Sequence, residues 1–147
     1  MICVQTEDFD LGAESRALVA GNHQVGGLAL FVGLVREMLP GVEQSMTLEH
    51  YPGMTEQQLE AIEAEAKARW PLEATLIIHR VGRLEPGDQI VLVAAASAHR
   101  QAAFEAAEFL MDYLKTKAPF WKKEEAGGEA QWVDARESDD TALERWR

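Results

Sequence analysis

The sequence predicts a single α+β domain built on a mixed or antiparallel sheet. Three observations support this fold class. The chain has 147 residues, the length of one ordinary domain, and it contains no internal repeat, low-complexity tract or linker. Segments typical of strands and helices do not alternate regularly, which disfavours a doubly wound parallel sheet. We therefore expect one domain over residues 1–147.

The N-terminal part predicts a short helix, two strands and a loop between them. Residues 8–22 mix acids with alanine and leucine, which favours a short helix. Residues 26–35, GGLALFVGLV, are apolar throughout and indicate a strand buried on both faces. The Pro40-Gly41 pair predicts a loop, and residues 47–51 a further strand.

The middle of the chain predicts a helix followed by two strands. Thr55 and Gln58 form a capping box, and apolar residues then recur at helical spacing until Pro71 ends the helix. Residues 75–81 and 89–96 are β-branched or aliphatic and predict strands, joined by a segment rich in turn residues.

A second helix is predicted from Ser97, which can cap it, to about Lys115. Its expected buried stripe consists of Ala103, Ala107, Leu110 and Leu114. Residues 121–125 and 130–133 indicate a terminal hairpin around two glycines. The polar tail from Glu137 is expected to be irregular or only loosely helical.

Composition excludes several classes of function. The formal net charge of −11 argues against general nucleic-acid binding, which needs a basic face. The longest apolar runs are too short to cross a bilayer, and the N-terminus lacks the basic and apolar regions of a signal peptide, so a cytoplasmic protein is expected. The four histidines lack the spacing of a helical metal site, and one cysteine cannot build a thiolate cage. We expect neither a metal nor a cofactor.

A basic cluster stands out against this acidic background. Four lysines and one acid lie between Asp112 and Lys123. The ordinary explanation is a solvated helix end whose cations complement the helix dipole. Lys115, however, follows an apolar stripe, where desolvation and neighbouring cations can lower a lysine pKa and produce a nucleophile or general base. Lys122 follows seven residues later.

Other cations lie at the ends of predicted elements. His99 and Arg100 fall in the first turn of the second helix, where free N–H groups attract anions. Arg100 could grip a phosphate or carboxylate there, or could instead pair with an acid such as Glu49. Arg36 directly follows the apolar strand. From the residues alone, the prediction is an anion-binding site of unspecified kind.

Several segments, taken together, resemble the large, catalytic subunit of the molybdopterin synthase family. In chain order they are FVGLVR (31–36), LEHYPGM (48–54), HRVGRLEPGD (79–88), SAHRQAAF (97–104), MDYLKTKAPFWKKE (111–124) and WVDARE (132–137). They cover most of the chain. The combination of LEHYPGM with DYLKTKAPFWKKE is highly specific.

The resemblance implies an α/β hammerhead fold with an additional small antiparallel sheet. It also implies a homodimer at the centre of a heterotetramer, with a small ubiquitin-like sulfur carrier at each end. The carrier's C-terminal Gly-Gly thiocarboxylate would enter a pocket of the large subunit. Two sulfurs would then be transferred to cyclic pyranopterin monophosphate, which opens the cyclic phosphate and leaves the dithiolene of molybdopterin.

The resemblance also implies roles for particular residues. Lys115 and Lys122 match the family's essential lysines. The substrate and phosphate pocket would be formed by Arg36, His99, Arg100 and Arg136, some of them contributed by the other protomer. Two alternatives remain open at this point. One is a lysine-dependent Schiff-base enzyme acting on a phosphorylated carbonyl compound, and the other is a non-catalytic anion-binding scaffold.

Overall fold

The fold is seen in a computed structural model that describes residues 1–133 and 137–147. Its elements follow in the order β1 (Ile2–Gln5), α1 (Leu11–Val19), β2 (Gly27–Leu34), β3 (Gln44–His50), α2 (Met54–Arg69), β4 (Leu72–Arg80), β5 (Gly82–Leu84), β6 (Gln89–Ser97), α3 (Arg100–Lys117), β7 (Phe120–Ala126), β8 (Glu129–Val133) and α4 (Glu137–Glu144). This order confirms the predicted α+β class.

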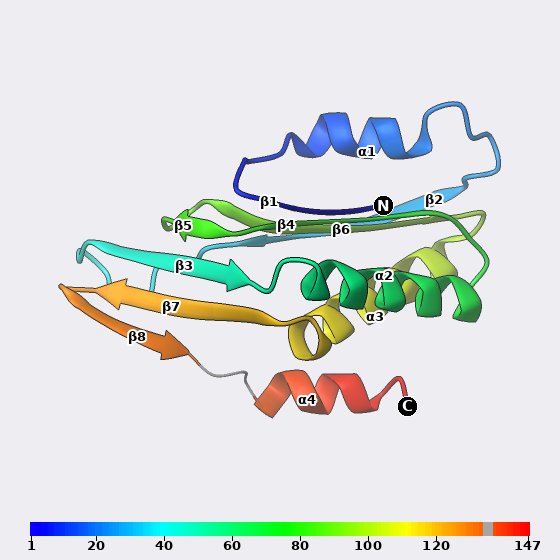
Figure 1. Cartoon of the computed structure of the whole chain (residues 1–147). Helices are drawn as coiled ribbons and strands as arrows, with labels where there is room; N and C mark the ends of the chain where they lie inside the picture. The colour runs from blue at the N-terminus through cyan, green and yellow to red at the C-terminus, as the bar shows by residue number, and fades with distance from the viewer. Residues whose placement is uncertain (134–136) are drawn as a thin grey trace.

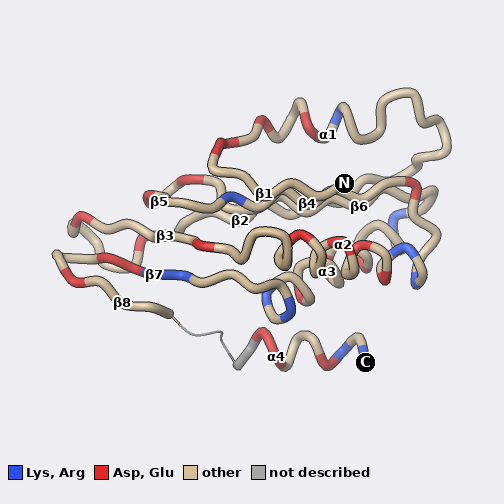
Figure 2. Tube along the Cα trace, in the orientation of Figure 1, with Lys and Arg blue, Asp and Glu red and all other residues tan. Residues whose placement is uncertain are grey.

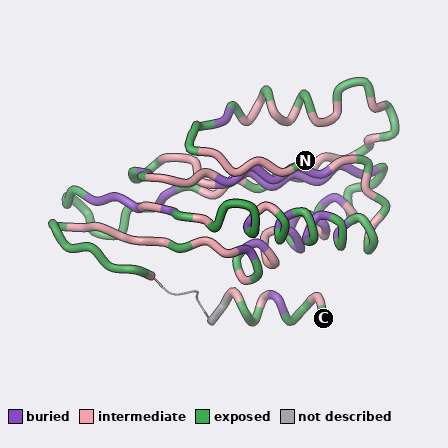
Figure 3. The backbone as a smooth tube through the Cα atoms, viewed as in Figure 1, coloured by how far each residue is buried: buried purple, intermediate pink, exposed green. Residues whose placement is uncertain are grey.

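The larger sheet has the strand order β1-β4-β6-β2 (Figure 1). β1 runs parallel to β4, whereas β4, β6 and β2 pair antiparallel, so the sheet is mixed as predicted. Side chains alternate between its two faces. Leu76 and Leu92 pack towards α1, and Ile77 and Val93 pack towards α2 and α3. The aliphatic runs of β4 and β6 therefore form the buried centre of the molecule (Figure 3).

Helix α3 lies close against this sheet because small side chains meet at the contact. Ala103, Ala106 and Ala107 pack against Ala29 of β2 and Ala95 of β6. Farther along the helix, the buried residues are larger and belong to the core that α3 forms with α2. The predicted stripe is thus confirmed. Within the described residues, no helix is long and apolar enough to cross a membrane.

Strand β2 corrects one prediction. Its apolar sequence predicted burial on both faces, but β2 is an edge strand that pairs with β6 alone. Phe31 and Leu34 are about half exposed, at 48% and 56%, and Leu30 is exposed as well. An apolar run predicts that a strand is buried, but it does not show whether the burying residues belong to the same chain. In this chain the edge stays open.

The smaller sheet has the order β5-β3-β7-β8 and is antiparallel throughout. It confirms the predicted hairpin, since β7 and β8 pair across Gly127 and Gly128, both with positive φ. β5 was not predicted. It covers three residues between the two long strands and continues from β4 at Gly82, which has a φ of 94°. A mixed sheet with a small antiparallel sheet beside it matches the fold that the resemblance implied.

Helix α2 begins one residue earlier than predicted and with a different cap. Its N-cap is Gly53, whose N–H donates to the Glu56 carboxylate at 3.1 Å. The hydroxyl of Thr55 makes longer-range contacts instead. It accepts from the Tyr51 N–H at 2.9 Å and donates to the Pro119 carbonyl at 3.0 Å. Thr55 is fully buried and ties the start of α2 to the turn before β7.

Helix α3 also begins differently from the prediction. Ser97 is the last residue of β6, and its hydroxyl donates to the Pro71 carbonyl at 2.8 Å rather than capping the helix. The helix starts at Arg100, with His99 at the N-cap position. At the other end, Pro119 prevents continuation beyond Lys117, because the residue before a proline is driven out of the helical region.

The C-terminal tail is more ordered than predicted. α4 packs on α3, with Leu143 only 2% exposed. Trp146 packs edge-on against Trp70 and Phe109, and its indole N–H donates to Asp112 at 2.6 Å. A polar tail sequence predicts an irregular segment, but these contacts with distant residues stabilise a helix.

A stacked pair of rings joins the two sheets. His79 of β4 lies on Phe120 of β7, with ring centroids 3.8 Å apart and an interplanar angle of 16°. The pKa of His79 is lowered to about 4, chiefly by burial. Electrostatic interactions with Lys115 and His50 act in the same direction, and a hydrogen bond to the Arg80 carbonyl opposes them. The ring is therefore neutral at physiological pH.

The depressed pKa of His79 predicts a loss of stability in acid. Above its ordinary pKa of 6.5 the ring is neutral in both states. As the pH falls towards about 4, the unfolded ring binds a proton that the folded ring does not. This group alone should then lower the free energy of unfolding by roughly 3 kcal/mol.

The measurement is urea unfolding across this pH range, for the natural protein and for His79→Gln. The variant has no group that titrates at this position, so its stability should fall less steeply with acid. Equal slopes for the two proteins would contradict the assignment.

Candidate functional site

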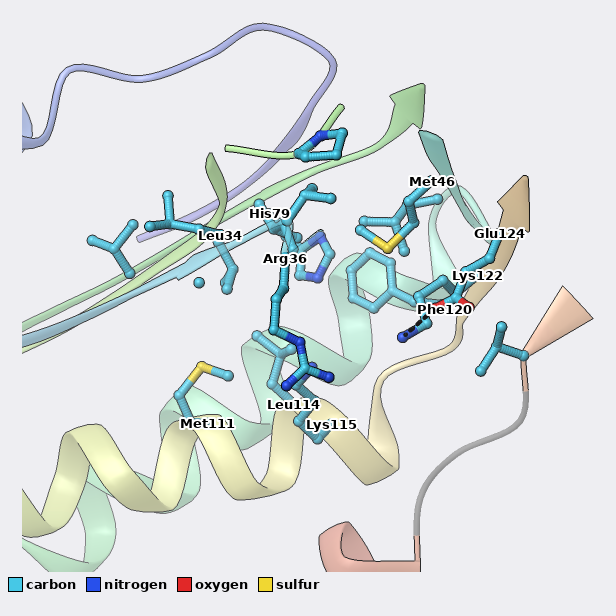
Figure 4. Close-up of a pocket in the computed structure, with 18 of the residues that line it drawn as sticks. Leu34, Arg36, Met46, His79, Met111, Leu114, Lys115, Phe120, Lys122 and Glu124 are labelled. Atoms are coloured by element: carbon cyan, nitrogen blue, oxygen red, sulfur yellow. Dashed lines mark ion pairs between the residues drawn. The ribbon is translucent and has the colours of Figure 1, made fainter. Parts of the chain in front are cut away.

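A cavity of about 700 Å³ lies where the two sheets and the end of α3 meet (Figure 4). The charged or titratable side chains that line it are Arg36, His79, Lys115, Lys122, Glu124 and Asp139. The remaining wall is largely apolar and includes Met46, Met111 and Leu114. A cavity of this size suits a small molecule or the end of an extended peptide.

Lys115 lies in the last turn of α3, where the helix dipole favours a cation. The preceding Leu114 is buried in the core and fixes the direction of the turn. Lys115 itself extends into the cavity beside Arg36 (Figure 4). Its side chain is exposed, so the desolvation predicted for it is not provided by this chain alone.

Lys122 reaches the same cavity from β7. Side chains alternate along a strand, so Phe120, Lys122 and Glu124 face the cavity together. The Lys122 ammonium lies 3.5 Å from the Glu124 carboxylate, and the Lys122 side chain is 30% exposed. Lys123 points to the opposite face and pairs with Glu125. Strand alternation therefore separates two neighbouring lysines, only one of which lines the cavity.

Arg36 enters from the end of β2. The preceding Val35 is buried and fixed by two backbone hydrogen bonds, to Asp88 and from Gly87, each of 2.8 Å. These bonds hold the strand end against the turn before β6. Arg36 thus brings a third cation to a cavity that already has two lysines.

Figure 2 shows acidic positions spread along the rest of the chain, and Asp and Glu outnumber Lys and Arg by 25 to 14 in the whole sequence. Because three cations and only two carboxylates are gathered against an apolar wall, the cavity is suited to an anion.

The structure does not bring His99 and Arg100 to this cavity within one chain. Both lie exposed at the start of α3, whereas Lys115 lies at its end. Fifteen residues of helix separate Arg100 from Lys115, a rise of about 22 Å. Among the described residues, Arg100 forms no ion pair, so the alternative pairing with Glu49 is not seen. Arg136 lies outside the described residues.

Sequence reasoning missed three of the charged or titratable residues that line the cavity, His79, Glu124 and Asp139. The signal for His79 was present in the alternation of β4, which places it on the same face as the buried Ile77. Glu124 lies two residues after Lys122 and so shares its face. Among the described residues, no three His, Cys, Asp or Glu side chains gather as a metal site would require.

Comparisons with known proteins agree on one family. A family model described as "MoaE protein" matches residues 4–117. The molybdopterin synthase catalytic subunit of Ralstonia nicotianae is 59% identical, over 99% of this chain and 83% of the relative. That of Pseudomonas aeruginosa is 56% identical, over 99% of this chain and 97% of the relative.

Solved structures give the same result. The MoaE protein of Burkholderia ambifaria superposes with a TM-score of 0.85 at 57% identity, covering 99% of this chain and 97% of that one. Molybdopterin synthase from Staphylococcus aureus superposes with a TM-score of 0.82 at 32% identity, covering 89% and 95%. Fold, family model and full-length identity agree: this chain belongs to the MoaE family, the family of molybdopterin synthase catalytic subunits.

Proposed function

We propose that this chain is the catalytic subunit of a molybdopterin synthase. It takes sulfur from the C-terminal thiocarboxylate of a small ubiquitin-like carrier and transfers it to cyclic pyranopterin monophosphate. One observation above all supports the proposal. Arg36, Lys115 and Lys122 come from three different elements and line one cavity in a protein of net charge −11. The thiocarboxylate and the cyclic phosphate are both anions, so one cationic cavity can hold the two reactants together.

The two lysines take different roles in this proposal. Lys115, exposed at the helix end, acts as the general acid/base or covalent group nearest the reacting pterin carbons. Lys122 is held by Glu124 and more deeply set, which suits it to orient the carrier's terminal carboxylate. Arg36 binds phosphate through paired hydrogen bonds.

A second copy of the chain completes the assembly in this proposal. The open edge of β2 exposes Leu30, Phe31 and Leu34, and Phe104 of α3 is 63% exposed beside it. Such an apolar surface suits a homodimer contact. His99, Arg100 and Arg136 remain proposed pocket residues, and His99 and Arg100 can reach a Lys115 cavity only from another chain.

The carrier is the other partner. The Helicobacter pylori structure that shares this fold is a complex of subunits 1 and 2 of molybdopterin-converting factor. We propose that the present chain likewise acts in a complex with a small subunit, as a heterotetramer around the homodimer. The cytoplasmic location expected from the sequence stays a prediction.

Lys115→Ala should abolish sulfur transfer while leaving the fold intact. The side chain is exposed at a helix end, so stability should change by less than about 0.5 kcal/mol, whereas the rate should fall by about 100-fold or more. The measurement is dithiolene formation from a thiocarboxylated carrier and the cyclic pterin, with thermal unfolding alongside.

Lys117→Ala is the matched control, because Lys117 shares the last turn of α3 but does not line the cavity. Intact transfer by Lys115→Ala with weaker carrier binding would favour the scaffold alternative. Borohydride trapping of Lys115 on a carbonyl substrate, without any carrier, would favour the Schiff-base alternative.

The rates of sulfur transfer by Lys122→Ala and Lys123→Ala should differ clearly, although the two residues are neighbours. Only Lys122 faces the cavity, so its loss should slow transfer by about 10- to 100-fold, while Lys123→Ala stays near the natural rate. Single-turnover rates with saturating carrier provide the comparison. Similar losses in both variants would show that the basic cluster acts through its overall charge.

Arg100→Ala should weaken binding of the pterin phosphate more than binding of the carrier. Removing a charged hydrogen-bond donor from a phosphate site costs about 1.5–3 kcal/mol, or roughly 10- to 100-fold in affinity. Calorimetric titration of each ligand measures the two effects separately. Arg16→Ala, exposed on α1 across the sheet, serves as the control. Equal weakening of both ligands by Arg100→Ala would contradict the assigned role.

A further inference from the structure

His79 is the one buried ionisable side chain of the cavity for which the proposed reaction gives no role. It is 5% exposed on β4 yet lines the cavity together with Lys115 and Lys122. Its ring is fixed on two sides, by the stack on Phe120 and by a 2.8 Å hydrogen bond between Nδ1 and the Arg80 carbonyl. A side chain held so firmly at the wall of a cavity has a defined orientation towards it.

The hydrogen bond to Arg80 determines which ring nitrogen carries the proton. A carbonyl oxygen only accepts hydrogen bonds, so Nδ1 must be the donor. In the neutral ring, Nε2 is then left with a lone pair. His79 is thus a fixed hydrogen-bond acceptor in a cavity that is also lined by the cations Arg36, Lys115 and Lys122.

The surroundings of His79 keep the ring neutral. Lys115 of α3 and His50 of β3 both act electrostatically on it and disfavour its protonation, in addition to burial. Arg36 after β2 and Lys122 of β7 add positive charge to the same cavity. Two carboxylates also line it, Glu124, which is paired with Lys122, and Asp139 of α4. A neutral acceptor beside an ammonium group can orient it without cancelling its charge.

We propose that His79 is a positioning residue for Lys115, whose ammonium donates a hydrogen bond to the Nε2 lone pair and is thereby directed into the cavity. The inference rests on the proposed function, since it assigns a role within the same site. It is independent of the packing role of the ring, because stacking requires only a flat aromatic surface.

Two substitutions separate the acceptor from the stack. His79→Gln keeps an acceptor, since the Gln Oε1 can take the place of Nε2, but it loses the aromatic contact with Phe120. His79→Phe keeps the aromatic contact and loses the acceptor. If Nε2 positions Lys115, His79→Phe should lower kcat by about 10- to 100-fold with little change in KM, and His79→Gln should retain most of the rate.

The control is His50→Gln, which should stay near the natural rate. His50 lies opposite Phe120 in β3 and also couples to His79, but it does not line the cavity. All variants are assayed in the complete complex with carrier, after thermal unfolding has shown that they fold. A natural rate in His79→Phe, or a larger loss in His79→Gln than in His79→Phe, would overturn the proposal and leave the ring a packing role.

A second measurement does not depend on sulfur transfer. Amine labelling of the complex at a series of pH values, followed by mass spectrometry of the Lys115 peptide, reports when the ammonium loses its proton. Loss of the acceptor should move the labelling midpoint of Lys115 down by about one pH unit in His79→Phe and leave it in place in His79→Gln. An unchanged midpoint in His79→Phe would refute the inference. Absence of dithiolene product with the natural protein would refute only the proposed function.

Discussion

The turn from α3 into β7 is the constraint on which the site depends. Ala118 and Pro119 end a helix and begin a strand within two residues, so lysines seven positions apart face one cavity. The buried Thr55 hydroxyl holds this turn by donating to the Pro119 carbonyl. The same hydroxyl accepts from Tyr51, so the end of β3 and the start of α2 are fixed to the turn as well. One small polar side chain thus ties two strands of the smaller sheet to the start of α2 beside the cavity.

The charge at the cavity is opposite in sign to the net charge of the protein. The chain as a whole repels anions, whereas the cavity gathers cations from three elements against an apolar wall. Cations on a low-dielectric surface attract an anion more strongly than the same groups dispersed in water. The carboxylates of Glu124, which is paired with Lys122, and of Asp139 moderate this field. The arrangement favours anions that fit the cavity over anions in general.

Much of the fold was predictable because it follows local patterns. β4, β6 and the buried stripe of α3 follow from aliphatic runs and helical spacing. The predictions that were wrong concern long-range contacts. Thr55 and Ser97 bond to residues distant in the chain instead of capping helices, and α4 is stabilised by the packing of Leu143 and Trp146. At the site, Lys115 and Lys122 were predicted to act together and do line one cavity, and Arg36 joins them.

The remaining site predictions depended on geometry that residue patterns do not give. His99 and Arg100 lie at the far end of α3, and the buried position of His79 depends on which element covers that face of β4. The sequence of β2 predicted that the strand is covered, but Leu30, Phe31 and Leu34 stay exposed among the residues that the structure describes.

The open edge of β2 has a practical consequence for anyone who prepares this protein. An apolar strand with unpaired backbone groups along one side is a template on which other strands can assemble without limit. Phe31 and Leu34 lie on that edge, which carries no lysine between Gly27 and Leu34 to block such assembly. The chain should therefore be most prone to aggregation while it is newly made and this edge is still uncovered. Solubility during expression should improve when a partner that covers this edge is present.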